Sequence, residues 1–183
     1  LDQKLELATD ETETAVKVRN WLHTFNGSIH FSQAYLSDNW YQGGNNNLNI
    51  LGNFVWDINL NQNEYKNLMF DNTIRYKMGL QSAPQDSLRG YSISEDLLQI
   101  NSKFGYKAFK HWYYSTTLLF KTQLLNNYAA NSNDLKASFL TPGELNLGLG
   151  MTYNAKSKNG YANFDLSLSP LSYNLKICRE NTR

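Results

Sequence analysis

The sequence contains one segment whose residue spacing resembles the start of a calcium-binding loop. Asp57, Asn59 and Asn61 alternate as the first three oxygen ligands of such a loop do. The sixth position, however, is Gln62 where the loop needs glycine, and the twelfth is Leu68 where it needs glutamate. A β-strand explains these residues better, so we expect no metal ion here.

The histidines and the single cysteine offer little further chemistry. His23, His30 and His111 do not share metal-ligand spacing with one another. His30 lies among polar residues and is the one candidate base for a Ser-His pair, as a barrel lipid hydrolase would need, but with 15 serines a chance pairing is expected. Cys178 alone forms neither an internal disulfide nor a cysteine metal cluster. We therefore predict no catalytic residue, no metal and no cofactor, and we expect that the protein is not an enzyme.

Phosphate-binding chemistry is also disfavoured. The glycines and asparagines of residues 43–47 are followed by neither a Lys-Ser/Thr pair nor a helical pattern, so a flexible external turn is expected. Seventeen basic residues nearly balance sixteen acidic ones, which gives a net charge of +1. A nucleic-acid surface needs a clustered basic excess, so no nucleic-acid partner is expected.

The composition is that of one domain with few charges. Only 18 % of the 183 residues are charged, against about 25 % in an average soluble domain, and 24 asparagines and 15 serines supply much of the polarity. No apolar run exceeds three residues, whereas a transmembrane helix needs about 20. Residues 1–20 are expected to form a disordered, polar periplasmic leader from which any export signal has been removed, and residues 178–183 form an atypical tail.

The dominant pattern has a period of two residues. Between residues 48 and 60, Leu48, Ile50 and Ile58 alternate with polar residues such as Asn49 and Asp57, as in a strand with one apolar and one polar face. Six further segments alternate in the same way: residues 27–35, 70–80, 98–108, 112–124, 145–153 and 164–168. These seven strands, without a convincing helix, predict an all-β fold, an antiparallel up-and-down transmembrane β-barrel that is incomplete in this chain, within residues 21–177.

Three details of strand pairing follow from parity. Leu60 opposite Leu68 would place Phe54 opposite Ile74, so that apolar faces match. Ala108 and Trp112 lie on one face, which predicts a three-residue loop over residues 109–111 instead of a two-residue turn. The apolar parity switches at Pro170, because the apolar residues that follow are odd-numbered, and this indicates a bulge or a strand end.

Three features favour a membrane over a soluble core. Strands of twelve or more residues, tilted, can cross about 30 Å of bilayer. Long connections at 37–46, 81–95 and 125–143 alternate with shorter ones at 61–67, 109–111 and 154–160, as extracellular loops and periplasmic turns do. Aromatic residues near strand ends suggest interface girdles, as rings with polar tips favour that zone: Trp40, Tyr65, Trp112, Tyr114 and Tyr153. We therefore expect outer-membrane lipid around the strands. The long loops, with Tyr91, Tyr128 and several asparagines, offer groups for contact with a glycan or a protein partner, but a solvated loop is the better explanation of these residues.

The polar face would then line the interior of the barrel. Its charged members are Asp57, Asp71, Arg75, Lys77, Lys103, Lys107, Lys121, Glu144 and Asp165. In a narrow barrel a plug of mutually bonded side chains is favoured over a charged pore wall. The alternative is a soluble exported β-barrel or sandwich with an apolar ligand, in which Phe54, Ile58, Phe104 and Phe120 would face a cavity.

Several short motifs in order resemble a known family. They include residues 30–33 (HFSQ), 101–107 (NSKFGYK), 112–114 (WYY), 120–123 (FKTQ) and 168–171 (LSPL). Over residues 27–173 the chain resembles the Gram-negative family catalogued as domain of unknown function 3078. The resemblance implies an exported outer-membrane β-barrel of unknown specific role, whether structural, in assembly or in transport, and it supplies no catalytic residue. Family members look longer and continue with more strands, and known bacterial barrels have an even number of strands, eight at least. We therefore expect further strands beyond the seven.

Overall fold

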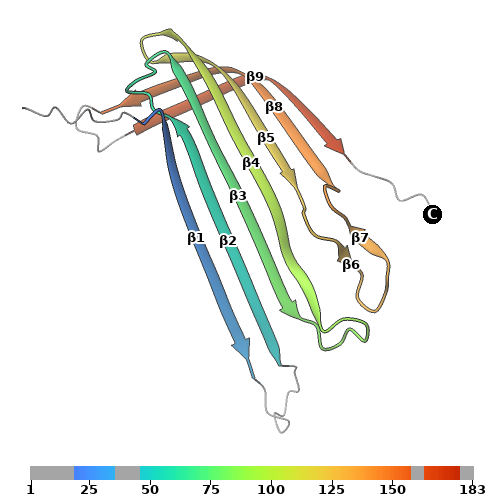
Figure 1. Cartoon of the computed structure of the whole chain (residues 1–183). Helices are drawn as coiled ribbons and strands as arrows, with labels where there is room; N and C mark the ends of the chain where they lie inside the picture. The colour runs from blue at the N-terminus through green and yellow to red at the C-terminus, as the bar shows by residue number, and fades with distance from the viewer. Residues whose placement is uncertain (1–18, 36–45, 158–162, 178–183) are drawn as a thin grey trace, which may run out of the picture.

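The computed structural model describes residues 19–35, 46–157 and 163–177. Seven long strands form one antiparallel sheet in which spatial order follows chain order (Figure 1). The strands are β1 (Trp21–Ala34), β2 (Asn47–Leu60), β3 (Leu68–Ser82), β4 (Tyr91–Phe109), β5 (Trp112–Thr122), β8 (Gly143–Lys156) and β9 (Asn163–Ile177). The all-β, up-and-down prediction is confirmed, but the sheet is not closed into a barrel, because β1 and β9 are its two edges. In the described part of the chain no helix is long and apolar enough to cross a membrane.

A second, small sheet lies in the longest described connection. Strands β6 (Asn127–Tyr128) and β7 (Leu135–Ala137) form a short hairpin between β5 and β8. The sequence analysis assigned this stretch to a loop. Two- and three-residue strands are too short to show alternation, so the pattern gave no sign of them.

The long and short connections lie at opposite ends of the sheet. Residues 83–90 and the segment that carries β6 and β7 extend from one end, which we call the loop end. Residues 61–67 and the turn at residues 110–111 close the other end, which we call the turn end (Figure 1). The predicted contrast in length is confirmed between the turn at residues 110–111 and the segment that carries β6 and β7. The long connection predicted at residues 81–95 is wrong in its bounds, because β3 continues to Ser82 and β4 begins at Tyr91, which leaves residues 83–90.

The predicted register between β2 and β3 is wrong by two residues. Trp56, not Phe54, lies opposite Ile74, and Phe54 lies opposite Tyr76. The connecting segment is folded as a turn in which the backbone carbonyl of Asn61 accepts hydrogen bonds from the N–H groups of Glu64 and Tyr65. A shift of two leaves every side chain on its predicted face, so alternation alone could not distinguish the two registers.

The predicted three-residue loop between β4 and β5 is also wrong. Phe109 pairs with Trp112, which leaves a two-residue turn with Lys110 at a positive φ of 41°. A bulge at Ala108, between Lys107 and Phe109, absorbs the parity conflict by inserting one extra residue in β4. Phe109 thereby reaches the apolar face, where its ring lies 6.3 Å from that of Trp112.

The bulge predicted at Pro170 is confirmed. Leu149 pairs with Leu171 but Met151 pairs with Leu168, so β9 has an extra residue at this point and continues to Ile177. The opposite position is Gly150, whose missing side chain is required because an added Cβ would overlap the carbonyl oxygen of Leu168. After the bulge the odd-numbered apolar residues of β9 share a face with Leu145 and Leu147.

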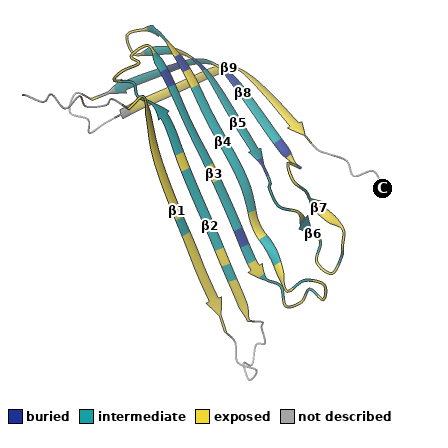
Figure 2. Cartoon of the chain, viewed as in Figure 1, coloured by how far each residue is buried: buried dark blue, intermediate teal, exposed yellow. Residues whose placement is uncertain are grey.

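The sheet is curved, and its two faces differ in chemistry. Met69, Ser115 and Thr152 are buried on the polar face, although a single open sheet has no second layer to cover them. In Figure 1 the end of β8 and the start of β9 bend over the turn end of the sheet. Large residues on the apolar face stay exposed, among them Phe25 at 66 % and Phe104 at 47 %, and Figure 2 shows β1 and β9 as exposed almost throughout. The polar face is therefore concave and the apolar face convex.

Candidate functional site

The concave face carries all nine charged residues that the sequence analysis placed in the interior. Cross-strand pairing puts Asp71 opposite Lys103, and Arg75 opposite Gln99, which in turn pairs with Lys121. The same pairing continues through Glu144 of β8 and places the remaining members on this face: Asp57, Lys77, Lys107 and Asp165. Their lining of a closed interior remains a prediction, because the sheet is open.

A hydrogen-bonded chain crosses the concave face from β4 to β9. The Nζ atom of Lys103 donates to Oγ of Ser167 at 2.8 Å. Ser167 Oγ lies 3.1 Å from Oγ1 of Thr152, which donates to Oγ of Ser115 at 3.0 Å. Thr152 is fully buried, and its hydroxyl is satisfied by these two partners.

This chain of hydrogen bonds also demonstrates the curvature of the sheet. Two strands, β5 and β8, separate β4 from β9. Three strand spacings amount to about 14 Å in a flat sheet, which is more than the side chains of Lys103 and Ser167 can cover. The sheet must therefore fold inward for them to meet.

Three more of the charged residues, Asp57, Asp165 and Glu144, bond to side chains on neighbouring strands. Asp57 accepts a hydrogen bond from Thr73 Oγ1 at 2.6 Å, and Asp165 accepts one from Asn154 Nδ2 at 2.5 Å. Glu144 forms an ion pair with Lys176, 3.3 Å apart, on adjacent strands. Whether these side chains plug a closed interior stays a prediction, because the described sheet is open.

Glycine residues leave room for larger neighbouring side chains on the concave face. A Cβ at Gly105 of β4 would lie only 2.8 Å from Cε of Met69. The lack of a side chain at Gly105 therefore leaves room for the buried side chain of Met69, which lies opposite it on β3. A Cβ at Gly148 would collide with Oγ1 of Thr117 on β5. A hollow of about 460 Å³ remains beside Lys103, and its lining mixes polar residues such as Asp71, Thr73 and Asn146 with Leu118, Leu119 and Leu147.

Aromatic rings gather on the convex face at the turn end. The rings of Trp21, Phe70 and Phe104 make successive edge contacts at 5.9 and 6.1 Å. Trp112 and Tyr153, both predicted girdle residues, are 5.2 Å apart in centroid distance. Of the other predicted girdle members, Tyr114 is 62 % exposed on β5 and Tyr65 lies in the connection between β2 and β3, while Trp40 is outside the described residues.

The motifs first considered for catalysis or metal binding take structural positions. Asp57 and Asn59 lie within β2 and bond across to β3, Asn59 through a hydrogen bond from the backbone N–H of Asn72. Within the described ranges no group of three or more His, Cys, Asp or Glu residues is arranged to hold a metal ion. His30 is exposed on the polar face of β1, opposite Leu51, and Cys178 lies outside the described residues.

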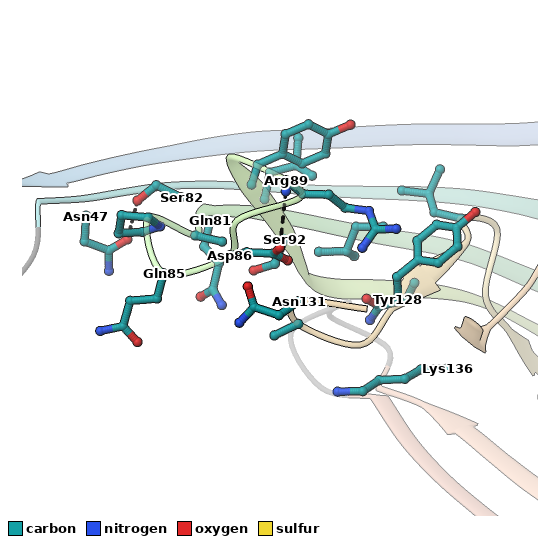
Figure 3. Close-up of a pocket in the computed structure, with 18 of the residues that line it drawn as sticks. Asn47, Gln81, Ser82, Gln85, Asp86, Arg89, Ser92, Tyr128, Asn131 and Lys136 are labelled. Atoms are coloured by element: carbon teal, nitrogen blue, oxygen red, sulfur yellow. Dashed lines mark hydrogen bonds between the residues drawn. The ribbon is translucent and has the colours of Figure 1, made fainter. Parts of the chain in front are cut away.

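At the loop end two segments far apart in sequence are bonded to each other, and Figure 3 shows side chains of both segments, among them Arg89 and Tyr128. Asn131 Oδ1 accepts hydrogen bonds from the backbone N–H of Ser87 at 2.8 Å and from its hydroxyl at 3.1 Å. The Arg89 guanidinium lies 4.2 Å from the ring centre of Tyr128 and donates to the carbonyl of Ser132. These contacts border a cavity of about 1060 Å³. These contacts could not be predicted from sequence spacing, because they join two irregular segments.

Asp86 caps the connection between β3 and β4. Its Oδ1 accepts hydrogen bonds from the backbone N–H groups of Leu88 at 2.9 Å and Arg89 at 3.2 Å. The hydrogen bond from Leu88, assisted by the other backbone N–H groups and the charge of Arg89, holds the pKa of this carboxyl below its ordinary value. Asp86 is therefore a fixed negative charge beside the loop-end cavity.

The fold and its polar concave face define an all-β protein with an open, curved, amphipathic sheet. A family model described as "Protein of unknown function (DUF3078)" matches residues 31–128, more than half of the chain, and the chain belongs to that family. No curated protein matches the chain, and no solved structure does.

Proposed function

We propose that this chain is part of an outer-membrane β-barrel whose convex face contacts lipid. The observation that carries the proposal is the placement of the apolar side chains. They lie on the convex face of all seven long strands; on β3 they are half-buried, and on each of the other six strands large ones are exposed, with Tyr173 of β9 at 61 % and Phe25 of β1 at 66 %. An exposed apolar surface of this extent is typical of proteins that contact a membrane or another protein.

The unpaired edges support the same proposal. Each presents a row of backbone groups over its whole length, and lipid offers no hydrogen bonds to such groups. Both edge strands keep the amphipathic alternation of the central strands, for example Phe25 and Ile29 on β1. We propose that further strands of the native polypeptide pair with both edges and close the barrel.

The bonded side chains of the concave face favour a plugged interior. Lys103, Ser167, Thr152 and Ser115 together bridge four strands across the hollow of the sheet. In a narrow barrel such a network leaves little room for an open channel. We therefore propose a structural or assembly role before a role as an open pore.

A soluble barrel with an apolar ligand is less well supported. It would need Phe54, Ile58, Phe104 and Phe120 around an enclosed cavity. Pairing places all four on the convex face, with Phe104 47 % exposed. No structural observation favours the third candidate, a lipid hydrolase with His30 as its base.

Adjacent positions on β4 provide a sharp test. Ile100 and Asn101 lie at the same depth in the strand but on opposite faces. In a Cys178→Ser background, we would place a fluorophore on Ile100→Cys or on Asn101→Cys and reconstitute each protein into vesicles that contain brominated acyl chains. We expect quenching at position 100 several times stronger than at position 101. Equal quenching at the two positions, or recovery of the protein in buffer without detergent, would contradict the proposal.

A further inference from the structure

The cavity at the loop end is held in shape by side chains from both of its walls. Arg89 Nη1 donates to the carbonyl of Ser132 at 2.8 Å, and its Nη2 donates to Oδ1 of Asn133 at 2.9 Å. Together with the bonds from Ser87 to Asn131, these contacts join residues 43 or 44 positions apart in the chain. A cavity fixed before a ligand arrives avoids much of the ordering cost of binding.

The lining of this cavity is rich in carboxamides. Asn47, Gln81, Gln85, Asn127 and Asn131 contribute to it, and Figure 3 shows side chains of several of them around the opening. Each carboxamide both donates and accepts hydrogen bonds. Donors and acceptors side by side match the hydroxyl groups of a sugar, each of which also does both.

Aromatic rings border the same space. Tyr91 lines the cavity and is 62 % exposed, and Tyr128 lines it from the β6–β7 hairpin. A tyrosine ring offers a flat apolar surface with a polar tip. The C–H face of a pyranose ring is likewise flat and apolar, so it packs well on such a surface.

The charges argue against an anionic ligand. The donors of Arg89 are directed to Ser132 and Asn133, and Asp86 places a carboxylate at the same cavity. Lys136 is the remaining cation in the lining, whereas phosphate recognition generally uses a cluster of basic groups. We infer that the loop-end cavity, lined by residues from segments 78–93 and 125–136 together with Asn46 and Asn47, binds a neutral oligosaccharide. This inference does not depend on whether the strands lie in a membrane.

The test compares two tyrosines of equal exposure at opposite ends of the sheet. Tyr91 lines the cavity, whereas Tyr114 lies on β5 toward the turn end, and each is 62 % exposed. The full chain, in a detergent without sugar headgroups, would be screened on an array of neutral oligosaccharides, and the strongest binder would be measured by calorimetry. We expect specific binding that falls at least tenfold in Tyr91→Ala and in Gln81→Ala but stays unchanged in Tyr114→Ala.

Three results would overturn the inference. The first is a folded protein that binds no neutral oligosaccharide on the array. The second is binding that survives both Tyr91→Ala and Gln81→Ala, because the ligand would then sit elsewhere. The third is a preference for phosphorylated or sulfated glycans over neutral ones. Circular dichroism of each variant shows whether its β-sheet is intact.

Discussion

The ammonium group of Lys103 lies 2.8 Å from the hydroxyl of Ser167, although two strands separate the strands that carry them. The contact is possible only because the polar face is concave. It joins the middle of the sheet to its β9 edge and so opposes flattening. Much of the behaviour expected of this sheet depends on the same curvature.

The Lys103–Ser167 contact should therefore have a measurable energetic coupling. A double-mutant cycle of Lys103→Met and Ser167→Ala isolates it from the separate effects of each change. The bond is charge-assisted but solvent-accessible, so we expect a coupling of about 0.5–1 kcal/mol. Urea unfolding of the folded protein measures it. A coupling energy indistinguishable from zero would mean that this contact does not help to maintain the curvature of the sheet.

Gly105 should not tolerate a side chain while Met69 is present. An added Cβ would lie 2.8 Å from Met69 Cε, and Met69 is only 1 % exposed. We expect Gly105→Ala to destabilise the fold by about 1–3 kcal/mol through overpacking. In a Met69→Ala background, which removes Cε, the same change should cost less. An equal cost in both backgrounds, measured by urea unfolding, would show that the two residues do not compete for this space.

Ala108 should be removable without disturbing the rest of the sheet. It is the extra residue of a bulge, since Lys107 pairs with Tyr113 and Phe109 with Trp112. Its deletion would leave a regular hairpin with every other residue on its present face. We expect the free energy of unfolding to change by no more than about 1 kcal/mol. Thermal unfolding of the deletion variant and the parent protein measures this change.

Deletion of Phe104 is the matched control for the Ala108 deletion. It lies in the regular part of β4, so its loss would turn residues on one side of it to the opposite face. We expect this variant not to fold. If both deletions were equally harmful, Ala108 would have a role beyond that of a bulge residue.

Asp86 should make the loop end sensitive to acid. Its pKa is lowered in the folded protein, chiefly by the hydrogen bond from the Leu88 backbone N–H. A lowered pKa contributes stability that is present above the pKa of the unfolded chain and is lost as the pH falls through the folded value. We expect a carboxyl NMR titration to place Asp86 below the ordinary range for aspartate. Asp86→Asn should flatten the acid limb of the unfolding curve. An ordinary titration midpoint would show that the cap does not form in solution.

The faces of the strands were predictable from sequence, whereas several of their partners were not. Alternation assigns Lys103 and Asp57 to the polar side because a period of two leaves no other choice. It does not distinguish registers that differ by two, so the pairing of Phe54 was missed. The start of β1 was missed because Leu22 interrupts the alternation on the polar face.

In the candidate site, too, the face of each residue was predictable from sequence but its contacts were not. Ser115 and Ser167 stand among the polar members of alternating segments, so their face was foreseeable. Their meeting with Thr152 and Lys103 depends on the curvature of the whole sheet, which no local pattern encodes. The contact between Arg89 and Tyr128 joins two connections without periodicity, where sequence spacing carries no information about distance.

Because each long strand pairs only with the long strands before and after it along the chain, the sheet can grow from one rim. A growing chain that ended after β5 would already contain every contact among its first five strands. The next hairpin would need only the unpaired edge of β5 in order to join the sheet. Among these seven strands no early strand must wait for a distant late one, as it must in a Greek key. Assembly by successive addition, with the newest border always available, is thus built into the order of the strands.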